Sequence, residues 1–188
     1  MITNSTDATI DSNDFIIQSS TLPVVHLRAM EPEDLDFLYD IENDTNVWQV
    51  GVTNVPYSRY LLHDYIAQST GDIYADGQVR LIVEDDTHQT IGLLDIINFS
   101  PTHQRAEIGI VISKNHRQRG YANATLQETC RYAHRILHLH QLYAVISESN
   151  EVAIRLFNKQ GFEKNNTLKD WLFDGENYQN AYLFSRFL

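Results

Sequence analysis

The chain has 188 residues, of which 43% are hydrophobic and 21% charged, so we expect one soluble globular domain with a short appendage. Its net charge of −11 argues against non-specific nucleic-acid binding, because phosphate contacts need a surplus of lysine and arginine. The acidic surplus instead favours cationic ligands. Cys130 is the only cysteine, which excludes an internal disulfide and favours a reducing, cytoplasmic compartment.

Residues 1–22 are rich in Ser, Thr, Asn and Asp and contain no Lys or Arg. They lack the basic and apolar regions of a signal peptide, and we expect a flexible tail followed by one domain over residues 23–188. No segment approaches the roughly 18 apolar residues of a membrane span, so no membrane partner is expected.

Apolar residues recur with helical or strand spacing along the rest of the chain. In chain order, these patterns predict a strand at 24–28, helices at 33–43 and 57–69, strands at 79–85, 91–99 and 105–113, a helix at 121–137, a strand at 142–147, a helix at 151–160, and a final hairpin of strands at 170–173 and 180–187. Gly161 is expected to end the preceding helix in a left-handed conformation. Antiparallel strands before a βαβ crossover predict an α/β (α+β) fold, in which a mixed, mostly antiparallel sheet has helices on both faces.

A turn between an expected strand and an expected helix carries the strongest functional signal. Residues 117–122, with the sequence RQRGYA, place Gly120 and Ala122 where larger side chains would block a close approach. Backbone N–H groups at a helix N-terminus favour an anion, and Arg117 and Arg119 add positive charge. The pattern predicts a pyrophosphate site; the alternative is an ordinary turn with solvated arginines.

This arrangement resembles the GNAT superfamily of acetyl-CoA-dependent N-acetyltransferases. The family signature Gln/Arg-x-x-Gly-x-Gly/Ala, placed after a strand, is matched by Arg117, Gly120 and Ala122. A second family motif, Asn-x-x-Ala-x-x-x-Tyr-x-x-x-Gly-Phe, is matched by residues 150–162 (NEVAIRLFNKQGF), except that Phe157 stands at the tyrosine position. The resemblance covers residues 24–187 and implies the GNAT fold.

Within the superfamily, four segments are similar to bacterial spermidine/spermine N-acetyltransferases: 92–95 (GLLD), 105–107 (RAE), 142–143 (LY) and 174–181 (DGENYQNA). The ribosomal-protein N-terminal acetyltransferases share much of this pattern. The resemblance implies acetyl-CoA as cosubstrate, with backbone N–H groups of residues 110–112 polarising the thioester oxygen. The residues it assigns to cofactor binding are Ile110, Val111, Ile112, Arg117, Gln118, Arg119, Gly120, Tyr121, Ala122, Asn150 and Phe157.

Acetylation of an amine requires removal of a proton, because free amines have pKa values near 10.4. Asp95 and Glu107 each interrupt an apolar strand, where an unpaired carboxylate is costly, and both are candidate catalytic residues. The alternative for Glu107 is a structural ion pair with Arg105 or Lys114. Phe157 has no hydroxyl to protonate the leaving thiolate, so we expect water or a hydroxyl such as that of Ser149 to substitute.

Residues 31–44 contain seven acidic and no basic residues. We expect Asp40 and Glu42, together with Trp48 and Asp95, to bind a cationic substrate, with Trp48 supplying a cation–π contact. The alternative is a solvated helix face. His138 and His140 lack a third ligand at a useful spacing, so no metal is expected.

The sequence thus predicts an N-acetyltransferase that acts by direct attack of a small cationic, polyamine-like amine on acetyl-CoA. Two alternatives remain: a protein N-terminal acetyltransferase of the ribosomal-protein type, and a weakly catalytic CoA-binding module that lacks the acid at Phe157. No nucleic-acid partner is expected, and a homo-oligomer is possible.

Overall fold

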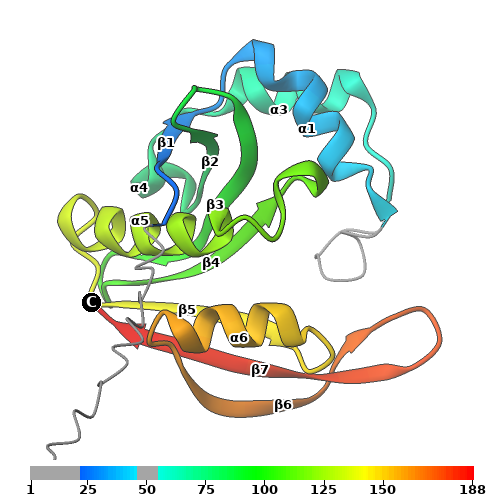
Figure 1. Cartoon of the computed structure of the whole chain (residues 1–188). Helices are drawn as coiled ribbons and strands as arrows, with labels where there is room; N and C mark the ends of the chain where they lie inside the picture. The colour runs from blue at the N-terminus through cyan, green and yellow to red at the C-terminus, as the bar shows by residue number, and fades with distance from the viewer. Residues whose placement is uncertain (1–21, 46–54) are drawn as a thin grey trace, which may run out of the picture.

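The structure is a computed structural model that describes residues 22–45 and 55–188 (Figure 1). Trp48, the expected loop around it and nearly all of the expected N-terminal tail lie outside the described residues. The elements are, in chain order, β1 (Val25–Ala29), η1 (Pro32–Asp34), α1 (Leu35–Glu42), α3 (Arg59–Gln68), α4 (Ile73–Asp76), β2 (Val79–Asp85), β3 (Thr90–Ser100), β4 (Arg105–Ile112), η2 (Lys114–His116), α5 (Tyr121–Arg135), β5 (Gln141–Ser147), α6 (Glu151–Lys159), β6 (Glu163–Phe173) and β7 (Tyr178–Phe187).

Seven strands form a single open sheet in the order β1-β2-β3-β4-β5-β7-β6. Neighbouring strands are antiparallel except β4 and β5, which are parallel and are joined by the crossover helix α5. The expected mixed, mostly antiparallel sheet is therefore confirmed. Gly161 has a φ of 76° directly after α6, which confirms its predicted left-handed conformation.

Helices cover both faces of the sheet, as predicted. On one face, Leu38 of α1 and Leu62 of α3 pack on Ile82 of β2 and Leu93 of β3. On the other, α5 and α6 contribute to a larger core that includes Leu126 and several inward residues of the central strands. Within the described residues, no helix has both the length and the apolar character needed to cross a membrane.

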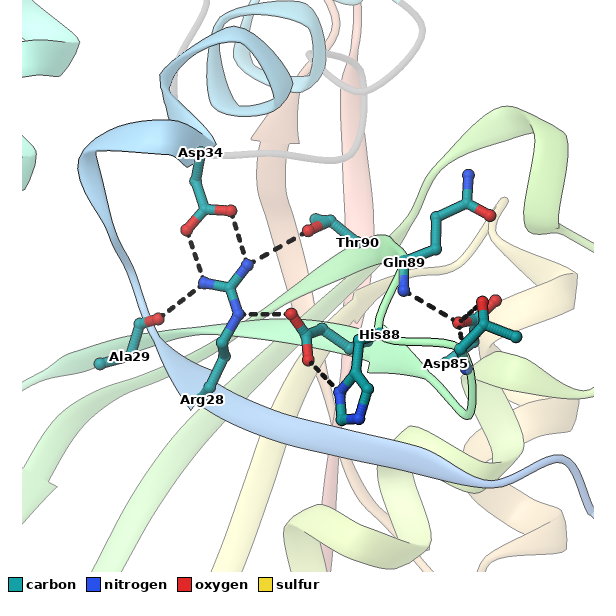
Figure 2. Close-up of polar contacts among 9 residues, drawn as sticks. Arg28, Ala29, Asp34, Asp85, His88, Gln89 and Thr90 are labelled. Carbon is teal, nitrogen blue, oxygen red and sulfur yellow. Dashed lines mark hydrogen bonds and ion pairs between the residues drawn. The ribbon is translucent and has the colours of Figure 1, made fainter.

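Arg28 joins the start of α1 to the sheet (Figure 2). Its guanidinium contacts both carboxylate oxygens of Asp34, at 2.6 and 2.8 Å, and its Nε donates to Glu84 at 2.5 Å. Asp34 also accepts the backbone N–H of Glu31 at 2.8 Å. Burial alone would raise the pKa of Asp34, but these hydrogen bonds hold it below its ordinary value. One end of α1 is therefore fixed to β1 and β2.

The C-terminal hairpin is longer than predicted. Strand β6 begins at Glu163, seven residues before the expected start at Asp170, and β7 begins at Tyr178 rather than Asn180. The first residues of β6 are exposed because β6 is the edge strand of the sheet, so they show no apolar alternation. The short helix α4 was also not predicted; Asp72 caps it by accepting the N–H of Tyr74 at 2.9 Å.

Candidate functional site

The central strands β4 and β5 separate after three paired residues. Their parallel pairing runs from Arg105↔Gln141 to Glu107↔Tyr143 and stops there. A cavity of about 590 Å³ lies where the two strands diverge; it is lined by Ile108 to Val111 of β4 and Ala144 to Ser147 of β5. In Figure 1, β4 and β5 start side by side and spread apart towards their C-terminal ends. This divergence places a cavity in the middle of the sheet.

The cavity extends over the sheet face covered by α1 and α3. Four charged residues line it: Glu42 from α1, Arg80 from β2, Asp95 from β3 and Glu107 from β4. Three negative charges therefore face one positive charge among the described residues. Most of the other lining residues are apolar, so a cationic ligand with apolar segments fits this composition.

Asp95 is paired with a cation. Arg80 donates to its two carboxylate oxygens at 2.6 and 3.0 Å, also contacts Glu42, and stacks 5.6 Å from the centre of the Tyr65 ring. Burial alone would lower the pKa of Arg80, but the hydrogen bonds and charges of Asp95 and Glu42 raise it. Arg80 is therefore a permanent cation that binds both carboxylate oxygens of Asp95.

Glu107 has a different environment. It accepts a hydrogen bond from Nδ2 of Asn98 at 2.8 Å, and no ion pair with Arg105 or Lys114 is found in the described part of the chain. Asn98 has a φ of 50° and lies at an irregularity in the β3–β4 register, which directs its side chain towards Glu107. Burial and the nearby Glu107 carboxylate raise the pKa of Tyr143. Glu107 is thus an ionisable group in the cavity that is held by a neutral amide.

The turn predicted to bind pyrophosphate leads from β4 into α5. Gly120 precedes the helix with a φ of 86°, Gln118 has a φ of 61°, and residues 117–120 are exposed. Arg117 anchors the turn by donating from Nε to the Ile112 carbonyl at 2.9 Å. The first backbone N–H groups of this 15-residue helix lack intrahelical acceptors. An anionic group at this position therefore fits the residues present.

Asn150 and Phe157 lie on the α6 side of the cavity. Asn150 caps α6, with its Oδ1 accepting the N–H of Ala153 at 3.1 Å. Phe157 is 5% exposed and packs edge-to-face with Phe162 at 4.9 Å between ring centroids. Beside them, the hydroxyl groups of Ser147 and Ser149 are 2.8 Å apart, and they donate to Oε1 of Gln179 at 3.2 and 3.3 Å; Ser147 lines the cavity.

Residues 25–163 match the family model of the Acetyltransferase (GNAT) domain. The chain belongs to the GNAT acetyltransferase family. It is therefore an acyl-CoA N-acetyltransferase that uses acetyl-CoA, and the diverging strands and the α5 turn provide a cavity and an anion site that fit this cosubstrate.

Curated relatives of this GNAT enzyme include the spermidine N(1)-acetyltransferases of Vibrio cholerae and Escherichia coli K12. The first is 28% identical over 156 residues, which cover 82% of this chain and 88% of the relative. The second is 29% identical over 158 residues, which cover 84% and 82%. The solved structure of the Vibrio cholerae spermidine N-acetyltransferase in complex with CoA and spermine is 26% identical, has a TM-score of 0.80, and covers 87% of this chain and 95% of that chain.

The structure brings some of the sequence-predicted residues of this GNAT enzyme together and separates others. Glu42, Asp95, Glu107, Ile110, Val111, Asn150 and Phe157 line one cavity. Ile112 is buried outside that lining, and Asp40 lies exposed on α1 away from it. Residues 117–122 form the separate turn at α5.

Three residues of the site escaped the sequence analysis: Arg80 and Ser147, which line the cavity, and Asn98, which donates to Glu107. Arg80 interrupts the apolar strand β2 just as Asp95 interrupts β3, so the same criterion identifies it. The contact between Asn98 and Glu107 depends on a backbone irregularity that leaves no clear sequence signal. Among the residues that the structure describes, no cluster of His, Cys, Asp or Glu could hold a metal ion.

Proposed function

We propose that this GNAT enzyme acetylates a primary amine of a small, polyamine-like cation by direct attack of the amine on acetyl-CoA. The supporting observation is the charge of the cavity, in which Glu42, Asp95 and Glu107 outnumber Arg80. The relatives named for spermidine and the neighbour solved with spermine support the same substrate class. A carboxylate-lined cavity stabilises a polycation and disfavours an anionic acceptor.

In this proposal, Glu107 accepts the proton of the attacking amine, directly or through one water molecule. Asp95 is less suited to this role, because Arg80 already binds both of its carboxylate oxygens. As the new N–C bond forms, the C–S bond breaks and the acetyl group leaves the sulfur. The ammonium group gives its first proton to Glu107 before the attack, the nitrogen gives its second proton to water as the amide forms, and the sulfur departs as a thiolate.

We assign backbone N–H groups of β4 to polarise the thioester oxygen. Ile110 and Val111 line the cavity in the part of β4 that is no longer paired with β5. Asn150 is assigned to the arm of acetyl-CoA, and residues 117–122 are assigned to its pyrophosphate.

Phe157 cannot protonate the thiolate, so another group must stabilise the charge on the sulfur. Ser147 lines the cavity, and its hydroxyl lies 2.8 Å from that of Ser149 and 3.2 Å from Oε1 of Gln179. We assign this hydroxyl, turned from Gln179 towards the sulfur, to replace the missing phenol. A thiol with a pKa near 8.5 is already a fair leaving group, so a weak donor of this kind is sufficient.

We further propose that the enzyme assembles as a homo-oligomer and works in the cytoplasm. A spermidine N-acetyltransferase of Vibrio cholerae has been solved as a dodecamer, and it has a TM-score of 0.74 to this chain with 27% identity, covering 87% of this chain and 93% of that chain. Cys130, the only cysteine, is buried and is compatible with a reducing compartment.

The proposal is tested by thiol release from acetyl-CoA with spermidine, spermine, putrescine and an N-terminal peptide offered separately. We expect turnover with one or more polyamines and none with the peptide. Turnover with the peptide alone would overturn the polyamine assignment in favour of N-terminal acetylation. Tight binding of acetyl-CoA without turnover on any acceptor would support a CoA-binding module instead.

A further inference from the structure

Two glycines lie inside the central strands, and they differ in what occupies the space beside them. A Cβ atom built on Gly92 of β3 would come within 2.4 Å of the Val111 carbonyl oxygen, so the packing of β3 against β4 requires a glycine there. A Cβ atom built on Gly109 of β4 would meet only Cβ of Asp95, at an ordinary contact distance of 3.9 Å. Packing therefore explains the first glycine and not the second.

Backbone conformation does not explain Gly109 either. It pairs with Asp95 in a regular antiparallel register, and it is not among the residues with positive φ. A glycine inside a strand destabilises the fold by about 0.5–1 kcal/mol relative to alanine. Neither packing nor backbone conformation therefore explains why residue 109 is a glycine. Glycine inside a strand often marks a place where a ligand approaches the backbone closely.

The position of Gly109 shows what such a ligand would meet. It lies in the cavity lining on the same sheet face as its cross-strand partner Asp95. Glu107, two residues earlier on the same strand, shares this face. On the other side of Gly109, β5 has already separated from β4, since their pairing ends at Glu107. The missing side chain therefore leaves a recess in the cavity floor beside two carboxylates.

We propose that this recess receives the reacting amine of the acceptor and that Gly109 determines acceptor specificity by setting the depth of the cavity. This inference rests on the proposed acetylation of a small cationic amine and adds where the amine end lies. Asp95 and Glu107 attract the ammonium group, and the absence of a side chain at residue 109 lets it reach the backbone next to Ile110.

The test is a side-chain series at residue 109, Gly109→Ala and Gly109→Val, measured with the acceptor that the wild-type enzyme uses best. Because the added atoms occupy the recess, we expect the KM for the amine to rise about 10-fold for alanine and further for valine. Both variants should keep the wild-type Kd for acetyl-CoA and a melting temperature no lower than wild type. Calorimetric titration with spermidine should show the same weakening without turnover.

Ala29→Val is the matched control, because it adds bulk to an exposed strand residue outside the cavity lining, and its KM should equal that of the wild type. If folded Gly109→Val keeps the wild-type KM and Kd for spermidine, the recess at Gly109 does not receive the amine and the proposal is wrong. If the proposed function itself is wrong, the result is different, because the wild-type enzyme would then neither acetylate nor bind spermidine, spermine or putrescine.

Discussion

Asp95 and Glu107 lie on one face of the sheet, but their neighbours give them different chemistry. Both carboxylate oxygens of Asp95 accept hydrogen bonds from Arg80, whereas Glu107 accepts one from the amide of Asn98. In the proposed mechanism, Asp95 therefore attracts the cation and Glu107 takes its proton.

Glu107→Gln should lower kcat by about 10²-fold or more, because the amide cannot accept the proton of the amine. Asp95→Asn is the comparison: it should raise the KM for the amine and largely retain kcat. Equal losses of kcat in the two variants would show that the roles are not divided in this way.

Phe157→Tyr should raise kcat, by up to about 10²-fold, because it adds a phenol that could protonate the leaving thiolate in the proposed mechanism. The ring is buried and lines the cavity, so the new hydroxyl can be placed without moving the backbone. Phe162→Tyr is a suitable control, since its ring contacts Phe157 from outside the cavity lining and should give no gain. An unchanged kcat in Phe157→Tyr would indicate that thiolate release is already assisted.

Among the elements, α1 is held to the sheet at both ends by arginine. Asp34, which directly precedes its first residue, is bound by Arg28 (Figure 2), while Glu42 at its end is bound by Arg80. Since Glu42 lines the cavity, the position of α1 determines one wall of the acceptor side. The Arg28 contacts, although they lie at the far end of the helix, thereby help to position that wall.

Arg28→Ala should lower the free energy of unfolding by about 3 kcal/mol near neutral pH, because it leaves Asp34 buried without its cation. The pKa values of Asp34 and Glu84 are lowered by folding, so their contribution is fully present above their unfolded-state values of about 4 and is lost as pH falls through the folded-state values. Melting curves from pH 7 to pH 3 should therefore fall less steeply in the variant than in the wild type.

Arg59→Ala provides the control for that comparison. Its ion pair with Asp36 joins α3 to α1, but the two side chains are 52% and 80% exposed. Its loss should cost less than about 1 kcal/mol. If the two variants lose similar stability, Arg28 does not act as a buried attachment.

Helices and strands with regular apolar spacing could be predicted from the sequence, because their period reflects the face that they bury. Leu35, Leu38 and Ile41 located α1 in this way. The edge strand β6 has no buried face over its first residues, so only its end near Phe173 was predicted. In the cavity, Asp95, Glu107 and Arg80 all interrupt apolar strands and carry the same sequence signal. The pairing of Arg80 with Asp95, 15 residues away, and of Asn98 with Glu107 at a register irregularity could not be predicted, because both depend on strand register.

The charge of the whole molecule acts in the same direction as the charge of its cavity. A chain with a net charge of −11 attracts polycations over a range set by the ionic strength, about 10 Å at 0.1 M salt. We expect the KM for spermidine to rise several-fold between 0.05 and 0.5 M NaCl in steady-state assays. A KM for spermidine that does not change with salt would show that local contacts alone determine its binding.

The three-residue junction between β4 and β5 also has a consequence for how the chain folds. The hairpins on each side of it connect strands close in sequence, whereas this parallel pair must wait until the 15-residue helix α5 has packed across the sheet. Contacts that close long loops form slowly. In refolding experiments, the β-sheet circular dichroism signal should therefore return before the capacity to bind acetyl-CoA. A newly synthesised chain would then form most of its sheet before it forms the cavity.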